Sequence, residues 1–168
     1  GPVPRGPSLH TEVQAAVTSH PGPLQGCDTY ALGALLYVAT ASPAFAARWF
    51  PDGLTRDALA RAPALRFNDK DRLQDDWAAG VAGERIALPT HRIASSTAFV
   101  DAAYLGIGWG MNPEPLVRAH LKAGRLVALI PDAPLDVPLH WQVARLTAKA
   151  LKPLTTAIRR AAEAVLIA

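Results

Sequence analysis

The sequence predicts an α/β fold of two lobes, built on a parallel or mostly parallel sheet. The chain has 168 residues, of which 50% are hydrophobic and 18% charged, which is typical of a globular protein with a real core. Short strand-like and helix-like segments alternate through its middle, and this alternation favours a parallel sheet. Segments 26–33 and 131–138, rich in glycine or proline, bracket the middle and predict two crossing connections between hinged lobes.

These connections divide the chain into ranges. Residues 34–133 are expected to form the second lobe, and residues 9–32 with 135–168 to form part of the first lobe. The opening residues 1–8 hold three prolines and two glycines. They are expected to be a tag remnant or a disordered lead-in, outside the fold.

The individual elements follow from apolar patterns and helix caps. The expected strands are 13–18, 30–40 as two segments meeting at a bend at Gly33, 64–67, 90–95, 106–111, 126–130 and 139–146. The expected helices are 43–50, 56–61, 69–79, 96–104, 113–123 and 151–166, while 85–88 is ambiguous. Ser42, Thr55 and Ser95 stand at N-cap positions, and Gly124 suits the end of a helix.

Charge and cysteine usage narrow the class of protein. The 17 Lys/Arg residues stand against 14 Asp/Glu residues, so the surface is mixed and lacks the clustered basic stripe of a nucleic-acid reader. The single cysteine, Cys27, excludes an internal disulfide, fits a reducing cytoplasm and is expected to be a small buried or turn residue. No apolar run reaches the length of about 18–20 residues that spans a bilayer, so no membrane association is expected.

No arrangement of residues predicts catalysis, a metal or a cofactor. The five histidines show no pair at helical ligand spacing, and one cysteine cannot build a zinc site with them. The glycines at 106, 108 and 110 lack the spacing of a dinucleotide fingerprint and favour close backbone packing instead. No nucleophile elbow is present. We therefore expect no catalytic residue, no metal ligand, no cofactor and no enzymatic activity.

Hydroxyl groups at the start of one helix form the first candidate binding site. A strand enters Ser95, Ser96 and Thr97, and a helix begins there. Free backbone N–H groups and the positive end of the helix dipole would suit a carboxylate or another anion. The alternative is that these residues only cap the helix.

The second candidate group is Phe67, Asn68 and Asp69, at the end of a strand and just after it. Asn68 and Asp69 would then lie at the carboxyl end of a strand, where open α/β sheets bind ligands, and the carboxylate could pair with a cation. The alternative is a favourable first-turn charge on a solvated helix face.

Short runs from about Glu12 to the last helix resemble, in order, one known family. The runs are Gln14–Ser19, Pro23–Cys27 with Leu32-Gly33, Ala41–Phe45, Phe50–Thr55, Phe67–Asp71 with Leu73–Asp75, Ser95-Ser96 with Ala98-Phe99, Gly106–Met111 with Pro113-Glu114, and Asp136–Leu139 with Trp141-Gln142. Together they resemble the C-terminal effector domain of LysR-type transcriptional regulators of the ArgP/LysG branch.

The resemblance implies a type 2 periplasmic-binding-protein-like fold of two lobes, with the second lobe complete and the first partial. It also implies lysine or arginine as effector in the cleft, held in part by the two candidate groups, and control of an exporter gene. DNA would be bound only through an N-terminal winged helix-turn-helix, which nothing here matches. Thr97 departs from the glutamate that the branch usually carries.

One further expectation follows from the partial first lobe, and one rival interpretation stands beside the regulator. An unpaired sheet edge and exposed apolar surface should favour self-association, as a homodimer or a larger assembly. The rival interpretation is a free-standing amino-acid-binding protein, which would need a secretion signal and a complete first lobe.

Overall fold

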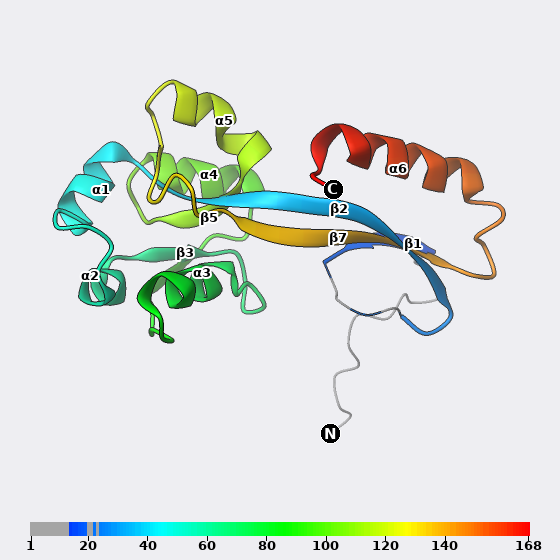
Figure 1. The fold of residues 1–168 in the computed structure, drawn as a ribbon, viewed down its shortest axis with the longest axis horizontal. Helices are drawn as coiled ribbons and strands as arrows, with labels where there is room; N and C mark the ends of the chain where they lie inside the picture. The colour runs from blue at the N-terminus through cyan, green and yellow to red at the C-terminus, as the bar shows by residue number, and fades with distance from the viewer. Residues whose placement is uncertain (1–13, 20–21, 23) are drawn as a thin grey trace. The chain divides into compact units, whose positions relative to one another are not determined.

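The computed structural model describes residues 14–19, 22 and 24–168; the predicted lead-in at 1–8 lies outside the described residues. The chain forms two compact units (Figure 1). Unit 1 comprises residues 1–35 and 136–168, and unit 2 comprises residues 36–135.

The larger sheet is antiparallel in its mapped registers, so the predicted parallel arrangement is wrong for it. Strand β2 (Cys27–Ala41) pairs antiparallel with β5 (Gly110–Pro113) and β6 (Val127–Ala128), and β1 (Ala15–Thr18) pairs antiparallel with β7 (Leu135–Ala144). The sheet neighbours of β2 are distant in sequence, so no simple strand–helix–strand crossover fixes their direction. Strands β3 and β4, by contrast, form a parallel ladder, and Ala64 of β3 makes a further parallel bridge to Trp109.

The two predicted connectors are largely strands. Strand β2 continues through Gly33 without the expected break, and strand β7 already begins at Leu135. Gly33 adopts a φ of +115°, and an added Cβ would lie 2.5 Å from the carbonyl oxygen of Ile167, so only glycine fits there. Pro138 lies in β7 ahead of residues 140–143, which pair with β1.

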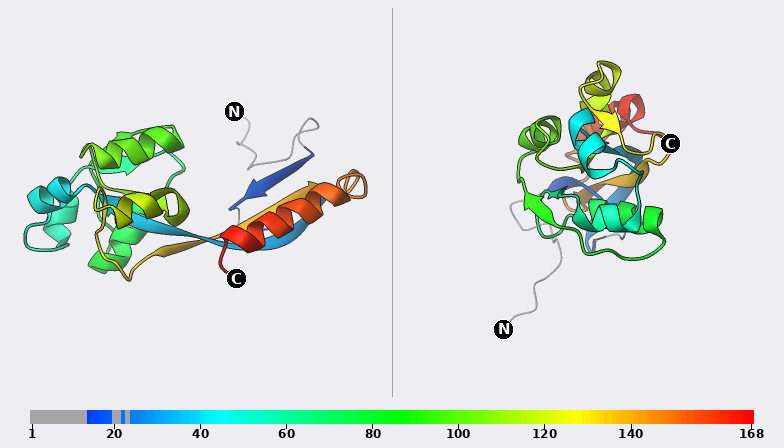
Figure 2. Two further views of the ribbon diagram at one scale, coloured as in Figure 1. Left: turned by 90° about the horizontal axis from the view of Figure 1, so that it is seen from above. Right: turned by 90° about the vertical axis from the view of Figure 1, so that its left-hand side faces the viewer.

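Unit 1 is held together by contacts of helix α6 (Lys152–Val165) with the strands (Figure 2). The indole Nε1 of Trp141 in β7 donates a hydrogen bond of 2.8 Å to Thr155 Oγ1, and both side chains are buried. The guanidinium of Arg159 lies 5.3 Å from the ring centre of Tyr30 in β2. Cys27 is buried and unpaired, which confirms its expected character.

Unit 2 contains the alternating elements that the sequence predicts, with shorter strands. They are α1 (Pro43–Trp49), α2 (Arg56–Arg61), β3 (Ala64–Arg66), α3 (Leu73–Ala82), β4 (Thr90–Arg92), α4 (Ser96–Tyr104), β5, α5 (Glu114–Lys122) and β6. The predicted caps are confirmed: Ser42 Oγ accepts from the Phe45 N–H, and Thr55 Oγ1 accepts from the Ala58 N–H, each at 3.1 Å.

The core of unit 2 has two apolar clusters, and successive residues of β3 contribute to different ones. Ala64 belongs to the cluster that contains Trp77 and Trp109, whose ring centres are 5.4 Å apart. Leu65 belongs to the cluster that contains Phe99 of α4. This alternation is that of a strand covered on both faces. An added Cβ at Gly110 would lie 2.6 Å from Phe99 Cε1, which confirms close packing as the role of this glycine.

Candidate functional site

The carboxyl ends of β3 and β4 lie at the same edge of their two-stranded sheet. The parallel register places Arg66 opposite Arg92, and the Ile93 N–H donates to the Arg66 carbonyl oxygen at 2.9 Å. Segment 67–72 follows β3, and segment 93–95 leads from β4 into α4. Both predicted groups of binding residues therefore start from adjacent strand ends, as expected from the sequence.

Asp71 organises the loop that follows β3. Its Oδ2 accepts hydrogen bonds from the Phe67 N–H at 2.9 Å and from Gln74 Nε2 at 3.0 Å. Its Oδ1 accepts from the Leu73 N–H at 3.1 Å, at the start of α3. One carboxylate thus satisfies two backbone donors and a side-chain amide, which fixes the loop between β3 and α3.

Gln74 ties this loop to the interior of unit 2. It is 1% exposed, and its Oε1 accepts from the Met111 N–H of β5 at 2.8 Å while its Nε2 serves Asp71. Both ends of the buried amide are therefore paired. Beside it, Arg66 donates to both carboxylate oxygens of Asp75, at 2.8 and 3.1 Å, and joins β3 to α3.

Asn68 and Asp69 lie exposed in the loop. Asn68 Oδ1 accepts from the N–H groups of Lys70 and Asp71, at 2.9 and 3.1 Å, so its oxygen shapes the turn and its amide Nδ2 faces outward without a partner among the described residues. Asp69 forms an ion pair with Arg92 at the end of β4. This ion pair joins the β3 loop to the segment that leads into α4.

The Ser95–Thr97 segment forms the beginning of α4. Ser95 caps the helix, and its Oγ accepts from the Ala98 N–H at 3.3 Å, as predicted. Ser96 and Thr97 are exposed, and within the described part of the chain their N–H groups have no acceptor. The helix therefore presents two free donors and the positive end of its dipole to an incoming anion.

The structure brings the two predicted groups to one strand edge, but it also adds residues that the sequence reasoning missed. These are Arg92, which pairs with Asp69, and the framework residues Asp71 and Gln74. The spacing of Asn68 and Asp71 could have indicated a side-chain-stabilised turn. Nothing in the sequence indicates the contact of Gln74 with Met111, because it joins positions 37 residues apart.

The negative charge of Asp71 in this loop also affects the pKa of Tyr37, in β2. Burial raises the pKa of its hydroxyl above the ordinary value of 10.0, and the negative charge of Asp71 raises it further. The phenol is therefore neutral beside this loop at physiological pH.

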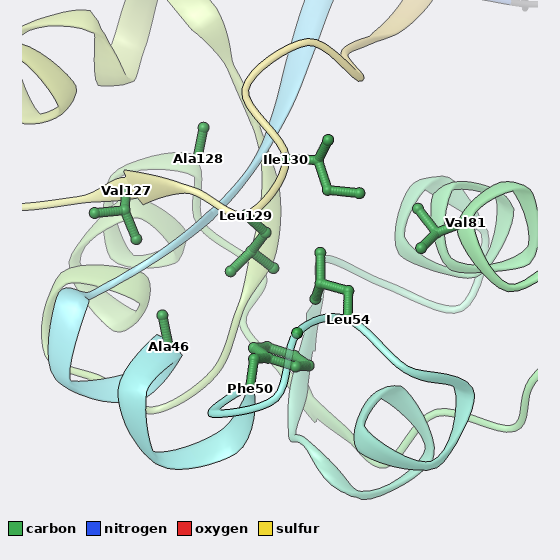
Figure 3. A pocket seen from close by; sticks show the side chains of 9 residues that line it. Ala46, Phe50, Leu54, Val81, Val127, Ala128, Leu129 and Ile130 are labelled. Carbon is green, nitrogen blue, oxygen red and sulfur yellow. The ribbon is translucent and has the colours of Figure 1, made fainter.

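Other features of unit 2 do not suit an amino acid. An apolar pocket of about 470 Å³ lies between α1, α3 and the β6 segment (Figure 3), and its lining side chains are all apolar. It offers no side-chain partner for an ammonium or carboxylate group.

Within the described ranges, no group of three or more His, Cys, Asp or Glu side chains could hold a metal ion. In the same ranges, no helix combines the length and apolar character needed to cross a bilayer.

An α/β unit with open amides, hydroxyls and a carboxylate at adjacent parallel strand ends has the architecture of a periplasmic-binding-protein-like sensor. Sequence comparison gives the family: the model described as "LysR substrate binding domain" matches residues 8–166, and the chain belongs to this family. The predicted resemblance to the LysR-type regulators is thereby confirmed. The match also favours a regulator over a free-standing binding protein.

Individual relatives agree with this assignment. The HTH-type transcriptional regulator ArgP of Pseudomonas fluorescens Pf-5 is 43% identical over 132 residues, which cover 77% of this chain and 43% of ArgP. The C-terminal domains of a LysR family protein from Agrobacterium tumefaciens share 54% identity, with a TM-score of 0.90 over 92% of this chain and 75% of that one.

A further structural relative carries a ligand. Full-length LysG of Corynebacterium glutamicum with bound effector Arg shares 32% identity, with a TM-score of 0.78 over 93% of this chain and 52% of that chain. The chain spans less than half the length of the curated relatives ArgP and LysG that it matches.

Proposed function

We propose that this chain is the effector-sensing part of a transcriptional regulator and binds lysine or arginine at the carboxyl edge of β3 and β4. One observation carries the proposal: the free N–H groups at the start of α4 and the carboxylate of Asp69 follow adjacent strand ends, in a chain of the LysR family. The effector Arg bound to the related LysG supports the choice of ligand.

The two sides of the strand edge match the two charged ends of a basic amino acid. Ser96 and Thr97 offer donors to the α-carboxylate at the positive end of α4. Asp69 offers a carboxylate to the cationic side chain or the α-ammonium group. Arg92 now neutralises Asp69, so a cationic ligand must compete with this guanidinium. Phe67, 37% exposed, and Asn68 lie beside the ligand in this proposal.

Calorimetric titration with L-arginine and L-lysine tests the site. Ser96 is the first residue of α4, where proline is tolerated, so Ser96→Pro removes one N–H group without breaking the helix. We expect Ser96→Pro to weaken binding about tenfold or more, because a charge-assisted hydrogen bond contributes about 1.5–3 kcal/mol. Ser96→Ala, which removes only the hydroxyl, should have the smaller effect.

The carboxylate side is tested by charge removal. Asp69→Asn should weaken binding, and Arg92→Gln should strengthen it because the competing cation is gone. Asp52→Asn, an exposed carboxylate in the turn after α1, is the matched control and should bind as the unmodified protein does. Unchanged affinity in Ser96→Pro and Asp69→Asn together would refute the assignment of this site.

The wider role of the protein extends the same proposal. We infer that it controls export of basic amino acids, works in the cytoplasm, has no enzymatic activity and contacts DNA only through a separate N-terminal helix-turn-helix domain. Units 2 and 1 would correspond to the second lobe and to part of the first lobe. Self-association as a homodimer or larger assembly belongs to the proposal as well, and sedimentation over a range of concentrations tests it.

A further inference from the structure

Unit 2 contains a second pocket whose lining is charged. This pocket, called here the cationic pocket, has a volume of about 720 Å³. Helix α1 with its N-cap, the end of α4 with the turn after it, and the turn after α5 form its wall. Its lining residues are Ser42, Pro43, Ala44, Phe45, Arg48, Trp49, Tyr104, Leu105, Gly106, Gly124 and Arg125. None belongs to the proposed amino-acid site.

Both charged side chains of the lining are arginines, and no carboxylate lines the pocket. Unit 2 has nine arginines, and five form ion pairs with carboxylates: Arg56, Arg66, Arg85, Arg92 and Arg118. Arg48 and Arg125 are two of the four that have no carboxylate partner among the described residues. The pocket therefore holds two of the four unit 2 arginines whose charge no carboxylate neutralises among the described residues.

Each of the two guanidinium groups contacts a ring instead of a carboxylate. Arg125 Nε donates to His120 Nδ1 at 3.0 Å, and the His120 ring lies 5.9 Å from the ring of Tyr104, which lines the pocket. The guanidinium of Arg48 lies 5.0 Å from the ring centre of Trp49. These contacts restrain the two cations and leave their charge available to a ligand.

The remaining wall is aromatic and apolar. Phe45 and Trp49 contact each other with ring centres 6.1 Å apart, and Tyr104 is 45% exposed. Leu105, beside Tyr104, is 70% exposed and adds apolar surface to this wall. A ligand that fits this wall has a flat or apolar body as well as a negative charge.

We propose that the cationic pocket binds a small organic anion, namely a carboxylate with an aromatic body. The carboxylate pairs with Arg48 and Arg125, and the ring lies against Trp49 and Tyr104. The same charge repels lysine and arginine, so this site and the proposed amino-acid site select ligands of opposite charge. The proposal depends on the pocket alone and stands whether or not the amino-acid site is correct.

Titration calorimetry with phenylacetate tests the proposal, with phenylacetamide as a neutral probe of nearly the same shape. We expect phenylacetate to bind, and Arg48→Gln and Arg125→Gln each to weaken it about tenfold, because each removes a charge-assisted interaction. Arg61→Gln is the matched control, since Arg61 is an exposed arginine of unit 2 that lies outside the lining and has no carboxylate partner among the described residues. It should bind as the unmodified protein does.

Several results would overturn the proposal. No heat from phenylacetate at millimolar concentration, equal binding of phenylacetamide, or unchanged binding in both pocket variants would each do so. Inorganic phosphate is the second probe, and equal affinity for it would reject the aromatic class. Titration of L-arginine into Arg48→Gln should match the unmodified protein, which separates this pocket from the amino-acid site.

Discussion

Replacing Gln74 by leucine should destabilise unit 2 substantially, although the volume of the side chain hardly changes. The substitution leaves the Met111 N–H buried without an acceptor and removes one donor from Asp71. A buried unsatisfied donor costs about 1–3 kcal/mol, and the lost hydrogen bond to a carboxylate contributes about 1.5–3 kcal/mol more. Burial of an added apolar surface offsets part of this loss. We expect the free energy of unfolding to fall by about 2–3 kcal/mol.

Urea denaturation followed by circular dichroism measures this loss. Gln25→Leu, at an exposed glutamine in the turn before β2, is the matched control and should change stability by less than about 0.5 kcal/mol. Asp71→Ala and the double variant complete a thermodynamic cycle, in which the two losses should be less than additive because the residues share a hydrogen bond. A loss below about 0.5 kcal/mol in Gln74→Leu would refute the reasoning.

Three further outcomes are expected. Gly110→Ala should lower the free energy of unfolding by about 1–3 kcal/mol, because its Cβ would lie 2.6 Å from Phe99 Cε1; an unchanged thermal midpoint would contradict the packing. Tyr37 should ionise above pH 10.0 in an absorbance titration at 295 nm. Its raised pKa stabilises the fold below that pH and the effect disappears as the pH rises through the folded-state pKa, whereas Tyr37→Phe should lack the late transition. The chain alone should bind no DNA sequence specifically, and a salt-resistant, sequence-specific gel shift would refute this.

Local signals in the sequence predicted the helices well. Ser42, Thr55 and Ser95 are the caps that were expected, because a cap depends on residues within three positions of one another. The candidate groups at 67–69 and 95–97 could be placed at strand ends because each lies at or just after the end of a short strand predicted from the sequence. Their role as an effector site stays a prediction.

Non-local pairing explains what the sequence did not reveal. Strand direction in the larger sheet depends on the pairing of Thr40 with Gly110 on one side and Ala128 on the other, and no local pattern encodes contacts over such separations. The strand is not interrupted at Gly33, and the N–H and carbonyl groups of the next residue, Ala34, pair with Ile167, far along the chain. Distance in sequence also hid the partner of Gln74.

In the loop after β3, the residues that hold the backbone differ from the residues that are exposed to solvent. Asp71 and Gln74 hold the backbone from within, whereas the side chains of positions 67–69 contribute the Asn68 turn and the exposed ion pair of Asp69 with Arg92. At the proposed site, a ligand would bind to a loop whose backbone is already ordered, so association would cost the loop little conformational entropy. In the proposed effector site, substitutions at 67 or 69 would therefore change contacts with the ligand while Asp71 still holds the backbone of the loop.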